Sequence, residues 1–370
     1  MIAIVYKVLF LKLLLLSDPV LNDYGQTRCV ILLARELCKK YDVSVVAPTI
    51  SQRIDSKLAS WGVQTVDLNI RSHTRESSTS WLETCLLEAL FSRNSRKLKR
   101  ALDLRTYKLI GFTCIYGIPA YDIAYGQGLI SQPLVSMDAI PSYYRVAIKM
   151  LNPLISKIDQ EFIVEASKSS RIVIANSEYC ASVYRRLGIR VHDVITPPLE
   201  CEVFKPTVSD IKDDYILSYV GKETDFTVIQ KLARIGIRMK MFGTKSSHVP
   251  ADLARNSNVE LLGHVTNKEL VELYSNAYYT LFPFTNEYFG YVPVESMACG
   301  TPVLTYGLEG PGETVIDGMT GWLARDREEI VQIATGLMRS GYPRNMRDEC
   351  RKHGLRFDIK KVAERWMRHI

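Results

Sequence analysis

Short apolar runs bounded by Gly, Pro or Asp alternate with longer amphipathic segments along this chain. Such alternation is typical of parallel strands joined by crossover helices. In the first half the pattern predicts strands at Lys12–Leu16, Val43–Ala47, Tyr121–Tyr125, Leu134–Met137 and Arg171–Ala175. In the second half it predicts strands at Tyr215–Val220, Met239–Phe242, Val259–Leu262, Tyr279–Phe282 and Val303–Tyr306. The predicted fold class is therefore α/β, with one parallel sheet in each half.

The chain length favours a division into two domains. The 370 residues exceed the size at which one hydrophobic core usually stops growing, and typical domains have roughly 100 to 200 residues. The prolines of Thr196-Pro197-Pro198 disfavour a continuing helix or a central strand, so we place the boundary there. We expect an N-terminal domain at 1–195, a C-terminal domain at 196–355, and a final helix at 356–370 that packs back on the N-terminal domain.

Composition and charge narrow the class of protein further. Hydrophobic residues make up 47% of the chain and charged residues 24%, close to the averages of globular proteins, which excludes disorder and fibrous repeats. The net charge of +7 suits a phosphorylated ligand or an anionic membrane surface, and we expect no nucleic-acid partner. The eight cysteines show no C-x-x-C pair, which favours a reducing, cytoplasmic compartment. Lys12 interrupts the apolar opening stretch, so we interpret that stretch as a buried strand and not as a signal peptide.

A glycine before the first predicted helix is a candidate for phosphate binding. The sequence contains neither G-x-G-x-x-G nor G-x-x-x-x-G-K-[ST], which argues against a dinucleotide-binding dehydrogenase and a P-loop protein. The polar loop 18–26 follows the first strand and leads into an amphipathic helix. Gly25 stands just before that helix, where a glycine lets the backbone approach a ligand and the helix N-terminus favours phosphate. The alternative is a plain turn glycine.

The strongest local signal is the segment 283–302 in the second half. A strand ends in a polar loop here, and Pro293 is suited to the first turn of a short helix. Gly290 thus falls at a helix N-terminus and at the carboxyl end of a parallel strand, where open α/β sheets bind ligands. Glu287 lies in the loop and Glu295 on the helix, where we expect it to be exposed. Two carboxylates facing one crevice suit a sugar, because their oxygens accept hydrogen bonds from hydroxyl groups.

At these residues the chain resembles the family 4 retaining glycosyltransferases of the GT-B fold, whose signature is E-x7-E followed by a small-residue helix. Glu287 and Glu295 stand eight positions apart, as the signature requires. Further matching segments are 259–265, 269–274, 313–323, 171–178 and 203–206. The resemblance extends from Leu13 to about Trp366. It implies two Rossmann-like parallel-sheet domains that face each other across a cleft.

The resemblance also implies roles for individual residues. Glu295 would hold the ribose of the donor, and Glu287 would contact the transferred sugar. The pyrophosphate would bind backbone groups around Phe289 and Gly290, and the nucleotide-binding set also includes Gly25, Tyr291, Val292 and Lys222.

Two departures from the family pattern leave questions open. The family carries a basic pair after the first strand of the second domain, whereas this chain offers only Lys222 there, so Lys245 or Lys231 is a candidate substitute. Where the family has an acceptor-side histidine, the polar candidates are Gln127 and Asp138.

The resulting hypothesis is a metal-independent, retaining transfer. The metal-binding motif D-x-D is absent from the sequence, so the charge of the leaving diphosphate would be met by Lys222 and backbone N–H groups. The expected co-substrate is a UDP- or GDP-sugar, no further cofactor is required, and the acceptor is a carbohydrate or a lipid-linked sugar. The alternatives are a catalytically silent nucleotide-sugar-binding module and a nucleotide-sugar epimerase of the same shape.

A basic, partly amphipathic helix is predicted from Arg93 to Lys108. It carries seven cations around Leu98, Leu102 and Leu104. One interpretation is a solvated helix face. The other is a surface that docks on anionic lipid, because basic amphipathic helices bind headgroups through charge and insert apolar side chains. The second interpretation gives a cytoplasmic protein that is peripheral to the membrane.

Overall fold

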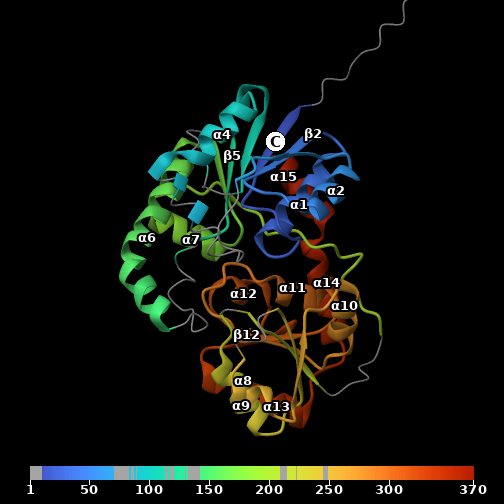
Figure 1. Ribbon diagram of the computed structural model, residues 1–370. Helices are drawn as coiled ribbons and strands as arrows, with labels where there is room; N and C mark the ends of the chain where they lie inside the picture. Colours follow the sequence, from blue (N-terminus) through green and yellow to red (C-terminus); the bar gives the residue numbers. More distant parts are fainter. Residues whose placement is uncertain are drawn as a thin grey trace, which may run out of the picture.

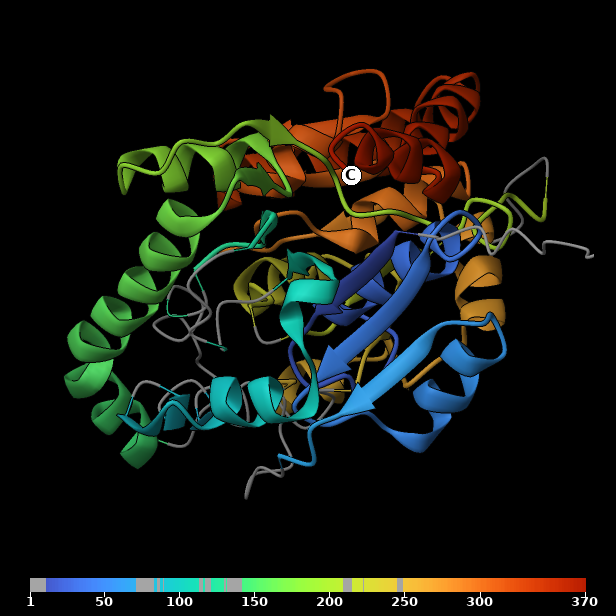
Figure 2. The same ribbon diagram turned by 90° about the horizontal axis from the view of Figure 1, so that it is seen from above.

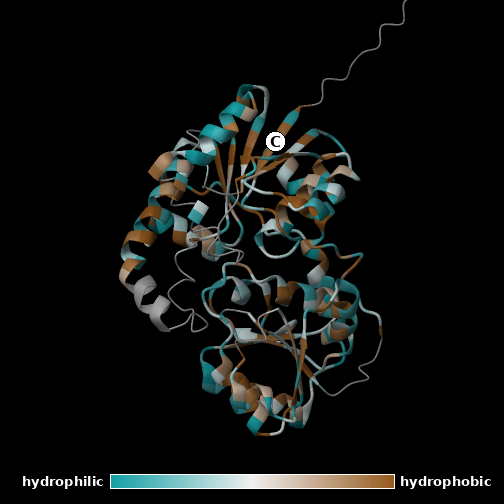
Figure 3. Cartoon of the chain, viewed as in Figure 1, coloured by the Kyte–Doolittle hydropathy of each residue, from teal (hydrophilic) through white to brown (hydrophobic). Residues whose placement is uncertain are grey.

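The chain folds into two α/β domains, one above the other in Figure 1. The structure is a computed structural model that describes residues 11–70, 83–84, 87–88, 90–112, 116, 121–129, 131, 142–208, 215–221, 223–244 and 249–370, with the backbone alone at 142–149. The strands of both sheets are largely hydrophobic, whereas the helices around them carry hydrophilic residues outward (Figure 3). Each domain therefore has its own core.

The N-terminal domain contains a parallel sheet of seven strands in the order β3-β2-β1-β4-β5-β6-β7. The strands are β1 Lys12–Leu16, β2 Asp42–Ala47, β3 Gln64–Asp67, β4 Lys108–Gly111, β5 Ile123–Gly126, β6 Ile172–Ala175 and β7 Asp193–Val194. The described helices around this sheet are α1 Gln26–Leu37, α2 Gln52–Ala59, α4 Arg93–Ala101, α6 Ser142–Ser169 and α7 Glu178–Arg186. Figure 2 shows these helices distributed around the sheet.

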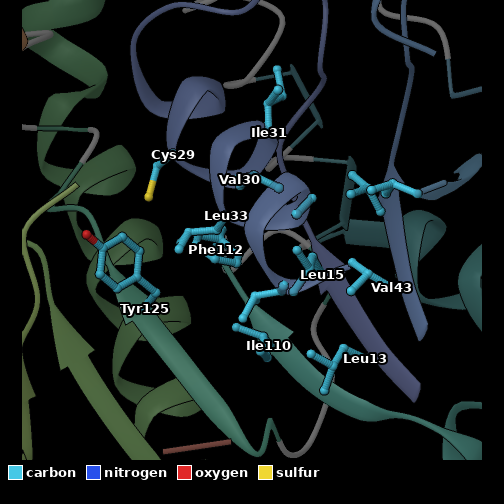
Figure 4. Packing of buried hydrophobic residues seen from close by; sticks show 14 of the residues in the cluster. Leu13, Leu15, Cys29, Val30, Ile31, Leu33, Val43, Ile110, Phe112 and Tyr125 are labelled. Atoms are coloured by element: carbon cyan, nitrogen blue, oxygen red, sulfur yellow. The ribbon is translucent and has the colours of Figure 1, made fainter. Parts of the chain in front are cut away.

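Helix α1 lies against the centre of this sheet because its apolar positions face the strands. Val30 and Leu33 pack with Leu13 and Leu15 of β1, as Figure 4 shows. All four side chains are buried. Because parallel strands are covered on both faces, β1 is an uninterrupted run of leucines after Lys12.

The C-terminal domain repeats this arrangement with six parallel strands in the order β10-β9-β8-β11-β12-β13. The strands are β8 Ile216–Tyr219, β9 Met239–Phe242, β10 Val259–Gly263, β11 Thr280–Phe282, β12 Val303–Tyr306 and β13 Gly321–Ala324. The helices are α8 Phe226–Arg234, α9 Ala251–Ala254, α10 Asn267–Asn276, α11 Tyr291–Ala298, α12 Glu309–Thr314, α13 Arg327–Ser340 and α14 Met346–Gly354.

In both sheets the first strand of the domain lies beside the fourth, so the strand order reverses between β1 and β4 and between β8 and β11. Ligands of open α/β sheets bind at such switch points, outside the carboxyl ends of the strands. This topology confirms the predicted α/β class with two Rossmann-like parallel-sheet domains.

Several strands differ from the sequence-based prediction. The strands β3, β4, β7 and β13 were not predicted. The edge strand β3 is polar, and β7 has only two residues. The predicted helix 93–108 is too long, because α4 ends at Ala101 and the last residue of the prediction, Lys108, begins β4. The predicted strand 134–137 lies outside the described residues.

The last helix, α15 Ile359–Met367, packs on the N-terminal domain beside α1. Trp366 is fully buried there, with its ring 5.5 Å from that of Phe112 and 5.0 Å from that of Tyr125. The chain thus passes between the domains twice. At the crossing, the Leu199 N–H donates to the Phe357 carbonyl, and the Ile359 N–H donates to the Leu199 carbonyl.

Within the part of the chain that the structure describes, every helix is too short or too polar to cross a membrane.

We predict that Trp366→Ala lowers the free energy of unfolding by about 3 to 5 kcal/mol, because it empties a fully buried aromatic site in the core of the other domain. Urea unfolding followed by far-ultraviolet circular dichroism measures the change. The exposed Lys360 on the same helix provides the control, since Lys360→Ala should change stability by less than about 0.5 kcal/mol. Equal stabilities of the two variants would contradict the anchoring role of Trp366.

Candidate functional site

The connection from β11 to α11 places a helix N-terminus at the switch point of the C-terminal sheet. Helix α11 begins at Tyr291, two residues before the predicted start at Pro293, with Gly290 as its N-cap. Gly290 has φ 79°, and a Cβ atom there would lie 3.3 Å from Pro311. Glycine therefore suits this position on two grounds. No side chain caps the helix start, so its N–H groups remain available to an anion.

Glu287 is held in this loop by contacts with α12. Its N–H donates to the Glu309 carboxylate over 3.0 Å, and its carbonyl accepts from the Gly310 N–H, also over 3.0 Å. Asn286, the residue before it, has φ 63°. The Glu287 side chain is half-buried, and its Oε1 accepts from the Phe289 N–H over 3.3 Å. These contacts fix the carboxyl beside the start of α11.

The surroundings of Glu287 favour its neutral form. Burial raises the pKa of Glu287 to about 7, and the nearby carboxylates of Glu223 and Glu309 add to the rise. The backbone N–H groups of Phe289 and Gly290 work in the opposite direction. Glu223 lies in the loop after β8, and Glu287 lies in the loop after β11. Carboxylates from the loops of both strands at the switch point therefore affect the pKa of Glu287. Near neutral pH this group can therefore hold or release a proton.

Glu295 is buried and paired, contrary to the expectation of an exposed carboxylate. It lies in the middle of α11 and is only 6% exposed. One carboxylate oxygen, Oε1, accepts from Nη1 of Arg28, and the other, Oε2, accepts from the Tyr274 hydroxyl over 2.9 Å. Helix α11 packs its whole length into the C-terminal core, which buries the glutamate with it.

Arg28 was missed by the sequence analysis, although it stands three residues after Gly25. It is the third residue of α1, in the N-terminal domain, so its ion pair with Glu295 joins the two domains. The guanidinium lies 4.9 Å from the ring of Phe204 and 4.9 Å from that of Tyr291. A cation in the first turn of a helix opposes the helix dipole. The unfavourable position of Arg28 in the first turn was therefore the sequence signal that this residue has a specific acidic partner.

The N-terminal domain contributes a pocket at the carboxyl ends of β4 and β5. Its lining includes Asp18, Gln26 and the segment from Gly126 to Gly128. Gln127 belongs to the lining, and its Nε2 donates to the Phe112 carbonyl over 3.0 Å. Gly25 is the N-cap of α1, with φ 61° and open space around its Cα.

Tyr288, from the same loop as Glu287, closes the contact between the domains. A Cβ atom on Gly128 would lie 2.2 Å from the Tyr288 ring, so only a glycine allows this approach. The ring also lies 5.2 Å from that of Tyr179 in α7. In addition, the Glu313 carboxylate of α12 accepts from the backbone N–H groups of Glu178 and Tyr179 at the start of α7.

The remaining predicted residues divide into two groups. Phe289, Gly290, Tyr291 and Val292 lie with Glu287 at the start of α11. Lys222, Asp138 and Lys245 lie outside the described residues. Lys231 pairs with Glu328 of α13 over 3.1 Å, and Figure 1 shows α8 and α13 at the end of the C-terminal domain farthest from the N-terminal domain. Lys231 is therefore badly placed to replace a second phosphate-binding cation.

The raised pKa of Glu287 predicts a pH-dependent contribution to stability. In the unfolded chain the group ionises near pH 4.5, and in the folded protein near pH 7. The folded state binds the proton more tightly, so this group's contribution falls as pH rises from about 4.5 to about 7.

We therefore expect the free energy of unfolding of Glu287→Gln, relative to that of the wild type, to increase across this window and to level off above it. Urea unfolding at pH 5, 6, 7 and 8 measures the difference. Glu260→Gln, at an exposed carboxylate of β10, should follow the wild type. Parallel curves for the wild type and Glu287→Gln would rule out the raised pKa.

Known proteins resemble this chain in sequence and in fold. Residues 214–356 match the family model described as "Glycosyl transferases group 1". The D-inositol 3-phosphate glycosyltransferase of Mycobacterium marinum is 24% identical over 213 residues, which make up 51% of this chain and 46% of that protein. The matched segment is thus less than half of the length of this relative.

Solved structures match over nearly the whole chain. Alr3699/HepE of Anabaena, in complex with UDP and glucose, has a TM-score of 0.68 at 16% identity and covers 97% of this chain and 98% of its own. WaaG, a glycosyltransferase involved in lipopolysaccharide biosynthesis, has a TM-score of 0.67 at 16% identity. The match covers 96% of this chain and 98% of the WaaG chain. The whole chain thus has the GT-B fold, and residues 214–356 of its C-terminal domain match the glycosyl transferases group 1 family model.

Proposed function

We propose that the chain is a retaining glycosyltransferase that moves a hexose from a nucleoside-diphosphate sugar to an acceptor without a metal ion. One observation carries the proposal. The uncapped N-terminus of α11 and the Glu287 carboxyl lie together at the switch point of the C-terminal sheet, facing the N-terminal domain. A helix start suits phosphate, and a carboxyl suits sugar hydroxyl groups.

The donor would bind along α11. Its diphosphate would accept hydrogen bonds from the N–H groups that follow Gly290, and its ribose would contact Glu295. The complex of Alr3699/HepE with UDP and glucose supports a UDP-sugar. Lys222 is the cation that we propose for the leaving diphosphate, and together with the helix dipole it would stabilise the charge that develops as the glycosidic bond breaks. Since the sequence contains no D-x-D motif, we propose that this stabilisation needs no metal.

Glu287 would contact the transferred sugar. With its pKa raised to about 7, its carboxyl can accept a hydrogen bond from a sugar hydroxyl or donate one in return. In a same-face mechanism the departing phosphate takes the proton of the acceptor hydroxyl, so no separate strong base is required. Tyr288, packed against Gly128 beside this loop, would help to exclude water from the site.

The acceptor would approach from the N-terminal domain. The pocket near Asp18, Gln26 and Gln127 offers polar groups among aromatic walls, and Asp138 is proposed on the same side. This mixture suits a sugar carried on an apolar group. The role of WaaG in lipopolysaccharide biosynthesis supports a lipid-linked acceptor.

Release of free UDP or GDP tests the proposal. The protein is incubated with UDP- and GDP-hexoses and a panel of sugar and lipid-linked acceptors, with and without EDTA. We expect diphosphate release that depends on the acceptor and is unaffected by EDTA. Binding without release would indicate a silent module, and conversion of the donor sugar without an acceptor would indicate an epimerase.

Glu287→Ala should lower kcat by about 10²-fold or more while changing the affinity for the nucleoside diphosphate by less than about threefold, because its proposed partner is the sugar. Initial rates and calorimetric titration with UDP measure the two effects. Thr285→Ala, at an exposed residue of the same loop, is the matched control. A normal kcat in Glu287→Ala would remove Glu287 from the reaction.

We also propose that the flank of the N-terminal domain formed by α4 and α6 docks on anionic membrane (Figure 1). The structure corrects the basis of this idea, because Leu98 is fully buried and Leu102 and Leu104 pack on the core. The apolar side chains available for insertion are instead Leu90 and Phe91, which are 70% and 57% exposed just before α4.

The exposed cations of this flank include Arg96, Lys99 and Arg100, and each would contribute ~1 kcal/mol near an anionic surface. We expect sedimentation with phosphatidylglycerol vesicles at low salt but not with phosphatidylcholine, and release at 1 M salt, where the Debye length is ~3 Å. Reversal of the three cations to Glu should abolish binding.

Reversal of three exposed cations of the C-terminal domain, Arg255, Lys268 and Arg344, gives the same change in net charge and should leave binding intact. If both triple variants bind equally, the flank is only a solvated surface.

A further inference from the structure

Two buried polar atoms in and beside the ion pair of Arg28 and Glu295 have no hydrogen-bond partner within the part of the chain that the structure describes. Nη2 of Arg28 and the hydroxyl of Tyr291 are both buried, and neither has a hydrogen-bond partner among the described residues. Arg28 is itself only 6% exposed. Buried polar groups are almost always satisfied, and the cost of an unsatisfied donor is larger for a charged group. The two atoms therefore indicate that a polar ligand completes this cluster.

The chemistry of the cluster defines that ligand. Each oxygen of Glu295 accepts one hydrogen bond from the protein, through Nη1 of Arg28 and the hydroxyl of Tyr274. A carboxylate has about four lone-pair positions, so each oxygen retains the capacity to accept another bond. The unsatisfied Nη2 requires an acceptor, and the remaining lone pairs of Glu295 can accept from two donors. Two neighbouring hydroxyl groups supply both kinds of bond, whereas a phosphate could only accept and would place its negative charge beside the carboxylate.

We propose that Arg28 and Tyr274 are positioning residues, which orient the Glu295 carboxylate so that it recognises the ribose of the donor. They fix the plane of the carboxylate so that one oxygen is available to each of the two vicinal hydroxyl groups, and Nη2 of Arg28 donates to one of those hydroxyls. The cluster thereby distinguishes a ribonucleotide from a 2′-deoxyribonucleotide. This inference rests on the proposed function, in which Glu295 contacts the ribose.

The origin of Arg28 gives the site a second property. Arg28 belongs to α1 of the N-terminal domain, and Phe204, whose ring lies 4.9 Å from its guanidinium, belongs to the linker, the segment that follows the domain boundary at 196–198. The ribose-binding cluster of Arg28, Tyr274 and Glu295 is thus complete only when α1 and α11 are in contact. Nucleotide recognition and domain contact are in this way linked through one guanidinium group.

Calorimetric titration with UDP, 2′-deoxy-UDP, GDP and 2′-deoxy-GDP tests the proposal on the full chain. We expect the wild type to bind the preferred ribonucleotide at least about tenfold more tightly than its deoxy counterpart, the effect of one lost hydrogen bond to a charged group. In Arg28→Ala the ratio should fall below about threefold, and Tyr274→Phe should lower it at least about twofold. Arg28→Lys keeps the charge but not the second Nη group, so its ratio should lie between those of the wild type and Arg28→Ala.

The ratio separates positioning from a structural effect, because general loss of packing weakens both nucleotides by the same factor. Arg35→Ala is the matched control, since Arg35 is also on α1 and pairs with Glu200 of the linker without touching Glu295. Its ratio should equal that of the wild type. If Arg28→Ala does not fold, Arg28→Lys and Tyr274→Phe still decide the question.

Wild-type ratios in Arg28→Lys and Tyr274→Phe, or an equal affinity of the wild type for both sugars, would overturn the inference alone. Failure of the wild type to bind any of the four diphosphates would overturn the proposed function as well.

Discussion

A buried guanidinium must have its charge compensated, and in this protein the compensation comes from the other domain. The side chain of Arg28, in the first turn of α1 in the N-terminal domain, forms an ion pair with Glu295 in the middle of α11 in the C-terminal domain. The pair is costly to break because either partner alone would be a buried charge without a counterion. The rings of Phe204 and Tyr291, each 4.9 Å from the guanidinium, help to shield it from water. The orientation of Glu295 depends on this pair, which adds to the other contacts between the domains.

The parallel topology explains why such a pair can exist at all. Both sheets reverse their strand order at the centre, between β1 and β4 and between β8 and β11. The loops that follow β1 and β11 carry the chain into α1 and α11, so these two helices start where the sheets face each other. Contacts of Tyr288 with Gly128 and of Glu313 with the start of α7 belong to the same boundary. One topological feature, used twice, thus assembles the candidate site.

The sequence predicted what periodicity and local motifs encode. Leucine-rich β1, the glycine before α11 and the spacing of Glu287 and Glu295 are local signals, and the fold followed from them. Local patterns do not report contacts between distant segments. Arg28 lies 267 positions from Glu295, so neither the burial of Glu295 nor the role of α1 was predictable. The leucines of α4 illustrate the same limit, because an amphipathic pattern does not say whether its apolar face meets lipid or the core.

The return of α15 to the N-terminal domain has a mechanical consequence. Because Leu199 is hydrogen-bonded to Phe357 and Ile359, the two connections between the domains are joined to each other at the point where they cross. Two connections that are hydrogen-bonded to each other at one point favour rotation of the domains about that point over sliding or separation. Trp366, packed against the rings of both Phe112 and Tyr125, anchors the second connection to the N-terminal domain. Any opening of the domains would therefore rotate them about this crossing, and it would part Arg28 from Glu295 while α15 stays on the N-terminal domain.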